Sequence, residues 1–408
     1  MQKELLQPLS GFRDYDGPVK NRVIEVIQKT FQRFGYQPLE TPSLERQEII
    51  LGKLGEDSQK QLYLFEDNGG RKVGLRYDLT VSLARYVAAN LNSLALPFKR
   101  SEIGNVWRAE RAQKGRLRQF TQADADIFGS DGIVAEKELL AMIAQVDKEL
   151  SLNITCLLND RRLAQRLLDE IKIPKDIQSR FLQTIDKATK ISGDQLDKEL
   201  VKLGLSDHQL KQTRMWFLAA DATDLTKLDV EPELKKPLED LLAVAKQLGL
   251  KTRVDLGMVR GLEYYTGTII EAVTDDFPSS LVGGGRYDDL VKELNGQQVP
   301  AVGISFGVDR IVEVLDSRGA AAPEGLFFTC LPETEKELRA WVAELRQNGR
   351  TVEIYLDSSV ELAKQLKYAA KRGLKTVYLP FAKEWQRNQI TKRDLESGEQ
   401  SVIERGDI

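Results

Sequence analysis

The chain has 408 residues, of which 41% are hydrophobic and 30% charged, with a formal net charge of -3. This length favours two or three domains, and the charge excludes a protein whose whole surface is basic, such as an indiscriminate nucleic-acid binder. The two cysteines, Cys156 and Cys330, lie too far apart to suggest a metal knuckle or a disulfide framework. Without an apolar signal segment or a run of ~18 apolar residues, a cytoplasmic protein with no membrane contact is expected.

The first elements follow from hydrophobic spacing and turn residues. Residues 18–34 predict an amphipathic helix ended by Gly35, with an apolar stripe of Val19, Val23, Ile24, Ile27, Phe31 and Phe34. The segment 62–80 predicts a β-hairpin around Asn68-Gly69-Gly70, and residues 81–92 predict a helix. Residues 98–110 and 116–129 predict two antiparallel strands, with the first continuing to Arg111 and the turn at residues 112–115, and residues 131–150 predict a helix.

The rest of the chain divides by composition. Residues 160–250 carry few strand signals and many helix formers, which indicates a helical insertion, and strands resume at 252–257 and 266–273. Small residues with Gly and Pro indicate a linker at 316–324. From residue 325 onward strand and helix patterns alternate, which is typical of a small α/β domain.

One face of the strand after residue 116 changes character along its length. Side chains two apart share a face, so that face carries Arg116, Arg118, Phe120, Gln122, Asp124 and Asp126, while Arg108 and Glu110 share a face of the preceding strand. Guanidiniums suit phosphate oxygens, a phenyl ring stacks on a base, and carboxylates suit an ammonium or imidazole N–H. The face fits a nucleoside triphosphate beside a small cation; a sheet edge with solvated charges would give the same pattern.

Three further stretches are weak alone but informative together. The run "GGGRYDDL" (283–290) allows close backbone approach to a ligand, or an ordinary turn. The run "GISFGVDRIVEVL" (303–315) places Arg310 early in an apolar helix, where a lone arginine is usually solvated. The run "RGLEYYTGT" (260–268) sets an arginine beside two tyrosines, which elsewhere are often core packing.

Taken in order, these stretches resemble the motifs of histidyl-tRNA synthetases, a family of class II aminoacyl-tRNA synthetases. Residues 35–45 resemble motif 1 with Pro42 as its proline, residues 98–129 resemble motif 2 and its loop, and residues 303–311 resemble motif 3. The remaining likenesses are two histidine-specific signatures and a substrate loop, at residues 260–268, 283–291 and 75–80. The resemblance covers nearly the whole chain, and its combination of motifs is highly specific.

The resemblance implies an α+β fold and a division into parts. It implies a class II antiparallel β-sheet core flanked by helices, with a helical insertion and a C-terminal α/β anticodon-binding-like domain. The expected parts are the first part of the catalytic core, the insertion, the second part of the core, the linker and the anticodon-binding-like domain, at residues 1–159, 160–250, 251–315, 316–324 and 325–408.

The implied enzyme is a ligase that activates L-histidine with ATP and Mg²⁺ and then charges tRNA(His). The implied catalytic residues are Arg108, Arg260 and Arg310, and the implied ATP-binding residues are Arg108, Glu110, Phe120 and Arg310. Histidine would be bound by Asp78, Thr80, Gln122, Asp126, Arg260, Tyr264, Tyr265 and Tyr287, and tRNA by Gln113, Lys114 and Arg116. No protein metal ligands are implied, and a homodimer is expected from motif 1.

A local basic patch agrees with a tRNA partner despite the acidic total. It would comprise Lys99, Arg100, Arg108, Arg111, Lys114, Arg116 and Arg118. There are two departures from the family pattern. Glu263 stands where the family usually has aspartate, and residues 381–389 do not match the usual loop near the C-terminus, which leaves anticodon contacts there open.

Two other classes of protein remain open on sequence alone. The regulatory subunit of ATP phosphoribosyltransferase resembles the same catalytic core, and a synthetase-like sensor would bind histidine or tRNA without catalysis. The regulator normally lacks the anticodon domain and tends to lose motif arginines, whereas residues 325–408, Arg108, Arg260 and Arg310 are all present here. The ligase is therefore favoured.

Overall fold

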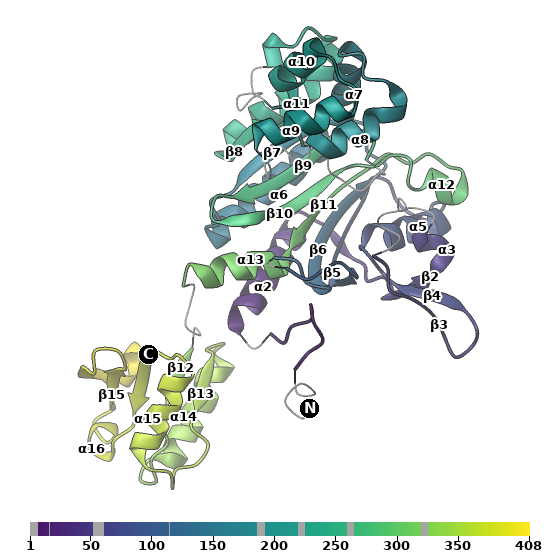
Figure 1. The fold of residues 1–408 in the computed structure, drawn as a ribbon. Helices are drawn as coiled ribbons and strands as arrows, with labels where there is room; N and C mark the ends of the chain where they lie inside the picture. The colour runs from purple at the N-terminus through teal and green to yellow at the C-terminus, as the bar shows by residue number, and fades with distance from the viewer. Residues whose placement is uncertain are drawn as a thin grey trace. The chain divides into compact units, whose positions relative to one another are not determined.

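The computed structural model describes residues 7–15, 17–51, 61–113, 115–185, 192–218, 225–258, 265–319 and 325–408. The chain divides into two compact units, Met1–Ser317 and Arg318–Ile408, each described separately below (Figure 1). None of the helices in the described segments has both the length and the apolar character needed to cross a membrane.

The first unit is built on a mixed sheet that has eight strands among the described residues. Their order across the sheet is β1 (Gln37–Pro38), β5 (Phe98–Trp107), β6 (Gln119–Phe128), β11 (Ala301–Gly307), β10 (Phe277–Arg286), β9 (Thr268–Thr274), β7 (Thr155–Asp160) and β8 (Lys251–Val254). The pairs β1–β5 and β7–β8 at the two edges are parallel, and the central pairs are antiparallel. The expected antiparallel core is therefore confirmed, with one parallel pair at each edge.

Helices cover one face of this sheet. The helices α2 (Pro18–Arg33), α6 (Val134–Leu150) and α13 (Val308–Ser317) contact one another or the central strands (Figure 1). Helix α2 begins with Pro18 at its first turn, and Gly35 follows it with φ +74°. Four residues of the predicted apolar stripe are buried and two, Ile24 and Phe34, are only half-buried; the four are Val19, Val23, Ile27 and Phe31. Phe31 of α2 packs on Phe306 of β11, with ring centroids 6.2 Å apart.

A small sheet and three short helices flank the central strands. The small sheet has the order β2 (Leu44–Arg46), β4 (Lys72–Leu75) and β3 (Leu64–Glu66), and the helices are α3 (Gln47–Leu51), α5 (Thr80–Asn90) and α12 (Lys292–Asn295). Strands β3 and β4 form the predicted hairpin, and Gly70 in its turn has φ +74°. Positive φ costs glycine little, which explains the turn residue.

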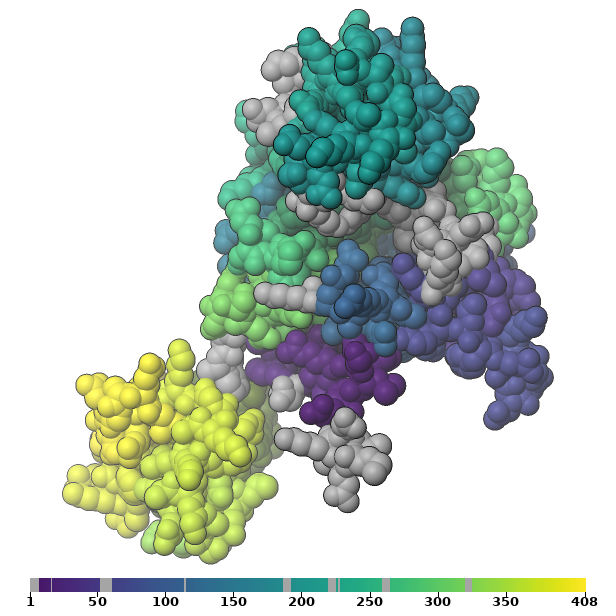
Figure 2. All heavy atoms as spheres, viewed as in Figure 1, coloured from purple at the N-terminus to yellow at the C-terminus, as the bar shows by residue number. Residues whose placement is uncertain are grey.

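The predicted insertion is helical throughout its described residues. It contains α7 (Arg161–Glu170), α8 (Lys175–Ile185), α9 (Gly193–Lys202), α10 (Asp207–Phe217), a 3₁₀ turn η1 (Leu225–Lys227) and α11 (Pro232–Leu248). Helices α7 to α10 gather at one end of the first unit, visible as a teal lobe in Figure 2. Helix α11 contacts α6, β7 and β8, and so joins the insertion to the sheet.

The second unit alternates strands and helices as its sequence predicts. Its elements are β12 (Leu326–Phe328), α14 (Glu335–Gln347), β13 (Val352–Ile354), α15 (Leu362–Lys371), β14 (Thr376–Leu379), α16 (Ala382–Trp385), β15 (Gln389–Asp394), β16 (Gln400–Glu404) and the 3₁₀ turn η2 (Arg405–Asp407). The sheet order is β13-β12-β14-β15-β16, parallel in the first two pairs and antiparallel in the last two. The sheet is thus mixed, because the chain after β14 returns antiparallel through α16 and then turns directly from β15 into β16.

Candidate active site

Two adjoining pockets lie on β6 and its neighbours. The first encloses about 620 Å³ of empty space and the second about 910 Å³. Both are lined by Arg108, Phe120, Gly307 and Arg310, which therefore form their common wall. The even-numbered side chains of β6, from Phe120 to Asp126, line the second pocket, as the period of two in the sequence predicts.

The loop between the two motif 2 strands is longer than the sequence suggests. Regular pairing of β5 with β6 ends at Trp107 and Gln119, so the connection spans residues 108–118 rather than the four residues 112–115. The prediction that the strands continue to Arg111 and begin at Arg116 is wrong. Only an isolated bridge pairs Gln113 with Arg116, and Gly115 within it has φ +72°.

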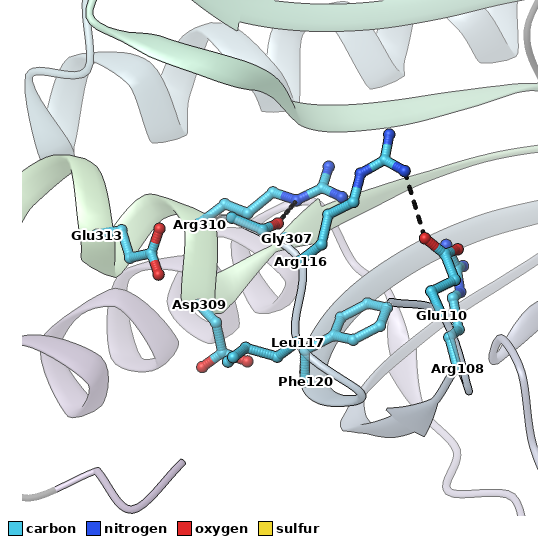
Figure 3. A pocket seen from close by; sticks show the side chains of 10 residues that line it. Arg108, Glu110, Arg116, Leu117, Phe120, Gly307, Asp309, Arg310 and Glu313 are labelled. Atoms are coloured by element: carbon cyan, nitrogen blue, oxygen red, sulfur yellow. Dashed lines mark hydrogen bonds and ion pairs between the residues drawn. The ribbon is translucent and has the colours of Figure 1, made fainter. Parts of the chain in front are cut away.

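Three arginines and three carboxylates line the first pocket, which is shown in Figure 3. The Arg108 guanidinium lies 4.2 Å from the centroid of the Tyr77 ring and 5.1 Å from that of Phe120, and its Nε donates to Tyr77 O at 3.2 Å. Stacking of this kind fixes the plane of a guanidinium without neutralising its charge. The Arg108 charge is therefore held toward the pocket.

Arg310 faces the same pocket from the first turn of α13. Its Nε donates to Gly115 O at 3.0 Å and its Nη1 to Ser280 O at 2.7 Å. Burial and the nearby Arg108 and Arg116 lower the pKa of Arg310 to about 10. A second cation beside a buried one costs free energy, and an anion in the pocket would offset that cost.

Glu110 has two arginine neighbours, of which Arg116 also lines the first pocket. Arg116 Nη1 lies 3.3 Å from Glu110 Oε2 (Figure 3). Arg118, by contrast, donates to two main-chain carbonyls, Glu110 O at 3.0 Å and Ser10 O at 3.2 Å. The expectation that Arg118 shares the phosphate face is wrong, because its side chain is used to tie the N-terminal segment to the loop.

The second pocket carries acceptor oxygens. Among the residues that the structure describes, three of its buried oxygens lack a hydrogen-bond partner: Asp78 Oδ2, Gln122 Oε1 and Asp124 Oδ1. Asp78 Oδ1 accepts from Val81 N at 2.9 Å and Gln122 Nε2 donates to Ser305 Oγ at 2.8 Å, so each side chain is held by its other atom. Burial raises the pKa of both Asp78 and Asp124.

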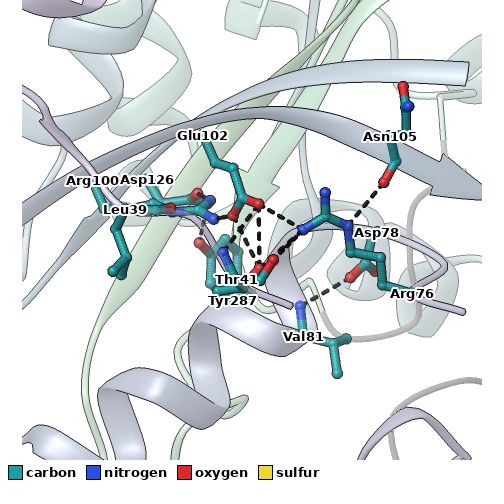
Figure 4. Close-up of polar contacts among 10 residues, drawn as sticks. All are labelled: Leu39, Thr41, Arg76, Asp78, Val81, Arg100, Glu102, Asn105, Asp126 and Tyr287. Carbon is teal, nitrogen blue, oxygen red and sulfur yellow. Dashed lines mark hydrogen bonds and ion pairs between the residues drawn. The ribbon is translucent and has the colours of Figure 1, made fainter. Parts of the chain in front are cut away.

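Asp126 lines the second pocket and belongs to a buried chain of polar contacts (Figure 4). Tyr287 OH donates to Asp126 Oδ1, and Arg100 Nη1 donates to Asp126 Oδ2 at 3.3 Å. A Cβ on Gly303, opposite Asp126 on β11, would collide with Asp126 Oδ1. Glycine at 303 is therefore what allows this carboxylate to lie across the neighbouring strand.

Most of the predicted site residues come together. The predicted ATP residues Arg108, Glu110, Phe120 and Arg310 line the first pocket, and the predicted histidine residues Asp78, Thr80, Gln122, Asp126, Tyr265 and Tyr287 line the second. Gln113 and Arg116 meet in the tip of the motif 2 loop. Arg260, Tyr264 and Lys114 lie outside the described residues, as does Glu263.

The predicted basic patch is smaller than its sequence suggests. Arg100 is fully buried, and Lys99 Nζ donates to Phe34 O at 2.5 Å and pairs with Glu138. Both side chains serve the fold instead of a nucleic-acid surface. Arg111 is exposed, as a phosphate contact requires.

Several pocket residues are absent from the predicted binding residues, although Asp124 lies on the strand face that the sequence predicts to meet a ligand. The structure adds Asp124, Glu271 and Ser305 to the second pocket. Asp124 carries a signal that points to it, because it alternates with Gln122 and Asp126 on one strand face. Ser305 and Glu271 come from β11 and β9, which only the tertiary fold brings alongside β6.

The sheet and its two pockets have the architecture of a class II aminoacyl-tRNA synthetase. A family model described as Histidyl-tRNA synthetase matches residues 17–311, and the chain belongs to this family. It is 35% identical to the histidine–tRNA ligase of Wolinella succinogenes, over 98% of this chain and 96% of that protein. A structure of histidyl-tRNA synthetase from Nostoc sp. PCC 7120 is similar with a TM-score of 0.82 and 25% identity, covering 98% of this chain and 97% of that one.

The regulator considered from the sequence has a similar fold. A Bacillus halodurans structure titled as an ATP phosphoribosyltransferase regulatory subunit/histidyl-tRNA synthetase has a TM-score of 0.73 at 22% identity, covering 89% of this chain and 96% of that chain. This likeness concerns the fold alone.

Proposed function

We propose that the chain is a histidine–tRNA ligase, which activates L-histidine with ATP and transfers it to tRNA(His). The observation that carries this proposal is a pocket in which main-chain carbonyls hold the Arg108 and Arg310 guanidiniums, adjoining a pocket of unpartnered carboxylate and amide oxygens. A triphosphate and an amino acid would meet at their common wall. The histidine–tRNA ligase of Wolinella succinogenes, aligned over 98% of this chain, supports the same activity.

Histidine activation needs no protein nucleophile in this arrangement. The carboxylate of histidine attacks the α-phosphate, and the enzyme aligns it and offsets the developing negative charge. Arg108 would bind the α-phosphate, Arg310 the γ-phosphate of a bent ATP, and Phe120 would stack on adenine. Glu110 would accept from the adenine amino group, which requires its bond to Arg116 to be given up or shared.

Arg260 is assigned to the α-phosphate opposite Arg108, on sequence grounds alone. Replacing it with alanine is expected to lower the rate of adenylate formation by about two to three powers of ten, with far less change in apparent ATP affinity. Single-turnover measurements with saturating histidine and ATP test this. An unchanged rate would remove Arg260 from the site.

The amino-acid pocket suits histidine by the number and type of its polar groups. Asp78 and Gln122 would receive the ammonium, with Thr80 beside them, and Asp126, Tyr264, Tyr265 and Tyr287 would face the imidazole. Burial raises the pKa of Tyr265, so its hydroxyl stays protonated and able to donate. A buried polar partner left unpaired rejects an amino acid that lacks the matching group.

We propose that Mg²⁺ enters with ATP. The described residues hold no group of three or more potential metal-binding side chains, so most ligands would be phosphate oxygens and water. Glu271 lines the second pocket together with Arg310 and would contribute a carboxylate oxygen to such an ion. When bound, Mg²⁺ would neutralise charge on the triphosphate.

The tRNA is proposed to contact two parts of the chain. Gln113, Lys114 and Arg116 in the motif 2 loop would meet its acceptor end, and residues 325–408 would bind its anticodon. The insertion at 160–250 would be a separate part between the two halves of the core, 1–159 and 251–315, with the linker at 316–324. The compact unit Arg318–Ile408 supports a separate C-terminal domain.

A homodimer is proposed from the motif 1 segment, residues 35–45. Three large apolar side chains on the adjacent small sheet support it, because they are unusually exposed: Leu44 at 48%, Leu64 at 37% and Phe65 at 44%. Light scattering is expected to give twice the chain mass of 46.0 kDa. A species of only the single-chain mass at micromolar concentration would count decisively against the dimer.

Histidine-dependent exchange of pyrophosphate into ATP tests the central proposal. Exchange is expected with L-histidine and with none of the other standard amino acids, followed by charging of tRNA(His). Histidine binding without exchange would instead identify a regulator or sensor. Exchange without charging would limit the proposal to amino-acid activation.

A further inference from the structure

Three unpartnered acceptors in the amino-acid pocket correspond in number to the three N–H bonds of an ammonium group. They are the oxygens Asp78 Oδ2, Gln122 Oε1 and Asp124 Oδ1, which lack hydrogen-bond partners within the part of the chain that the structure describes. All three side chains line the second pocket. An unpaired buried polar atom costs about 1 to 3 kcal/mol, so three in one pocket indicate a ligand that supplies several donors.

Asp126 is already paired, and this separates it from the other two carboxylates. Arg76 Nη1 donates to Glu102 Oε1 at 2.6 Å, Arg100 pairs with Glu102 Oε2, and Arg100 Nη1 donates to Asp126 (Figure 4). This buried chain contains two cations and two anions and is formally neutral: Arg76, Glu102, Arg100 and Asp126. Among the described residues, the two buried arginines of this polar chain are thus engaged with Glu102 and Asp126, and neither pairs with Asp78 or Asp124.

Asp124 lines the second pocket from β6. It is 2% exposed, and it stands opposite Glu102 on β5 and Ser305 on β11. Glu102 is engaged with the two arginines and with Thr41, so it offers Asp124 no donor. The open side of Asp124 Oδ1 is therefore the pocket.

We infer that Asp124 is a further specificity-determining residue, which completes with Asp78 and Gln122 a three-point acceptor for the α-ammonium group of the amino-acid substrate. This inference rests on the proposed function and deepens it by one residue. It leaves Asp126, with Tyr265 and Tyr287, to the side chain of the substrate. The ammonium cation would place a positive charge beside Asp124 and Asp78, because the buried arginines Arg76 and Arg100 pair with other carboxylates.

The protonation of Asp124 gives this contact a pH dependence. Burial and the neighbouring Asp126 raise the pKa of Asp124 to about 8. The other charged or titratable groups that line the pocket or face Asp124 are Asp78, Arg100, Glu102, Arg108, Tyr265, Glu271, Tyr287 and Arg310. In the site without substrate, Asp124 is mostly protonated below about pH 8. An ammonium group next to Asp124 Oδ1 favours loss of that proton.

The sign of the effect follows from these two states. Binding lowers the pKa of Asp124, so substrate binding releases a proton, and affinity increases as pH rises toward about 8 before levelling off. Above that range the substrate's own ammonium begins to lose its proton. Titration calorimetry of the full-length protein in buffers of different ionisation enthalpy is expected to detect proton release at pH 7 for the wild type and less for Asp124→Asn.

The decisive experiment removes the ammonium from the ligand and the charge from the residue. L-Histidine is compared with 3-(imidazol-4-yl)propanoate, which keeps the ring and carboxylate but lacks the amino group. Asp124→Asn is expected to weaken L-histidine binding by about 10- to 100-fold, the scale for one hydrogen bond to a charged group, and to change binding of the propanoate by less than about threefold.

Asp160→Asn is the matched control. Asp160 is a fully buried carboxylate that caps α7 and pairs with Arg162, away from both pockets. It is expected to alter thermal stability and to leave the preference for L-histidine over the propanoate unchanged. A general effect of losing a buried carboxylate would reduce that preference in both variants and overturn the inference.

The outcomes separate this inference from the proposed function. If the wild type neither binds L-histidine nor supports exchange, the proposed function fails and the inference falls with it. If the wild type is active and Asp124→Asn binds L-histidine equally well, only the inference fails. Equal loss for L-histidine and the propanoate would also overturn it, because it would assign Asp124 to the ring or the carboxylate.

Discussion

The two ends of the site on β6 hold charged side chains of opposite sign, and they hold them through different kinds of contact. At the arginine end, Arg108 and Arg310 are held by the carbonyls of Tyr77, Gly115 and Ser280, which orient a cation without cancelling its charge. At the acidic end, Asp126 is bonded to Arg100, whereas Asp78 and Asp124 have no buried arginine partner among the described residues.

This difference separates residues that recognise a ligand from residues that hold the fold. Where neutral groups hold a charged side chain, the full charge remains for the ligand. Where an opposite charge holds it, part of the electrostatic interaction is already used within the protein. By this criterion more electrostatic interaction with the substrates is available from four side chains than from Asp126; the four are Arg108, Arg310, Asp78 and Asp124.

The largest expected effect is on stability, at the centre of the buried chain. Glu102→Gln leaves Arg76 and Arg100 with one anion between them and is expected to lower the free energy of unfolding of the first unit by about 3 to 5 kcal/mol. Urea unfolding measures this. Glu110→Gln, which loses only a partly exposed pair with Arg116, should cost less than about 1 kcal/mol, and equal losses would contradict the contrast.

The arginine end is tested by rate. Arg310→Ala is expected to lower the single-turnover rate of adenylate formation by about two to three powers of ten, because an oriented charge is lost where negative charge develops. Arg116→Ala provides the comparison, since Arg116 already pairs with Glu110. It should leave adenylate formation within about threefold and reduce tRNA charging. Similar losses in adenylate formation would remove the distinction between the two arginines.

The acidic end is tested through histidine affinity. Asp126→Asn is expected to raise the KM for histidine by about 10- to 100-fold, with little change in the KM for ATP. Gly303→Ala should act in the same direction, because its Cβ would displace Asp126 Oδ1. A Gly303→Ala enzyme with normal histidine KM would show that the position of this carboxylate is unimportant.

The smallest expected effect on histidine activation comes from removing the second unit. A chain ending at Ser317 keeps every described residue of both pockets, so histidine-dependent exchange should change by no more than about threefold. Charging of tRNA should fall steeply. Charging as efficient as that of the full chain would contradict the assignment of residues 325–408 to tRNA binding.

The sequence predicted the site where the pattern is local. Alternation along residues 120–126 is a property of any strand, so the pocket-lining face of β6 was predictable without knowledge of its neighbours. Most helices and the hairpin at Gly70 were predictable for the same reason. The parallel edge pairs were not, because partners far apart in sequence decide them.

Two failures of prediction share one cause, which is that arginine side chains are long. Arg100 follows a lysine and reads as part of a basic patch, yet its partners Glu102 and Asp126 enclose it. Arg118 reads as a phosphate ligand, yet Ser10 and Glu110 supply carbonyls for it. A guanidinium can bond to groups that no local pattern reveals.

The bond from Arg310 to Gly115 has a consequence for how variants of this chain are interpreted. Gly115 is at the tip of the motif 2 loop, where position alone would assign a substitution to tRNA recognition. A Cβ there would press on Phe277, and Gly115 O is also one of the two carbonyls that orient Arg310. A substitution of this glycine would therefore alter the nucleotide pocket even in the absence of tRNA. If only the charged tRNA were measured, a defect in histidine activation would be mistaken for a defect in tRNA recognition.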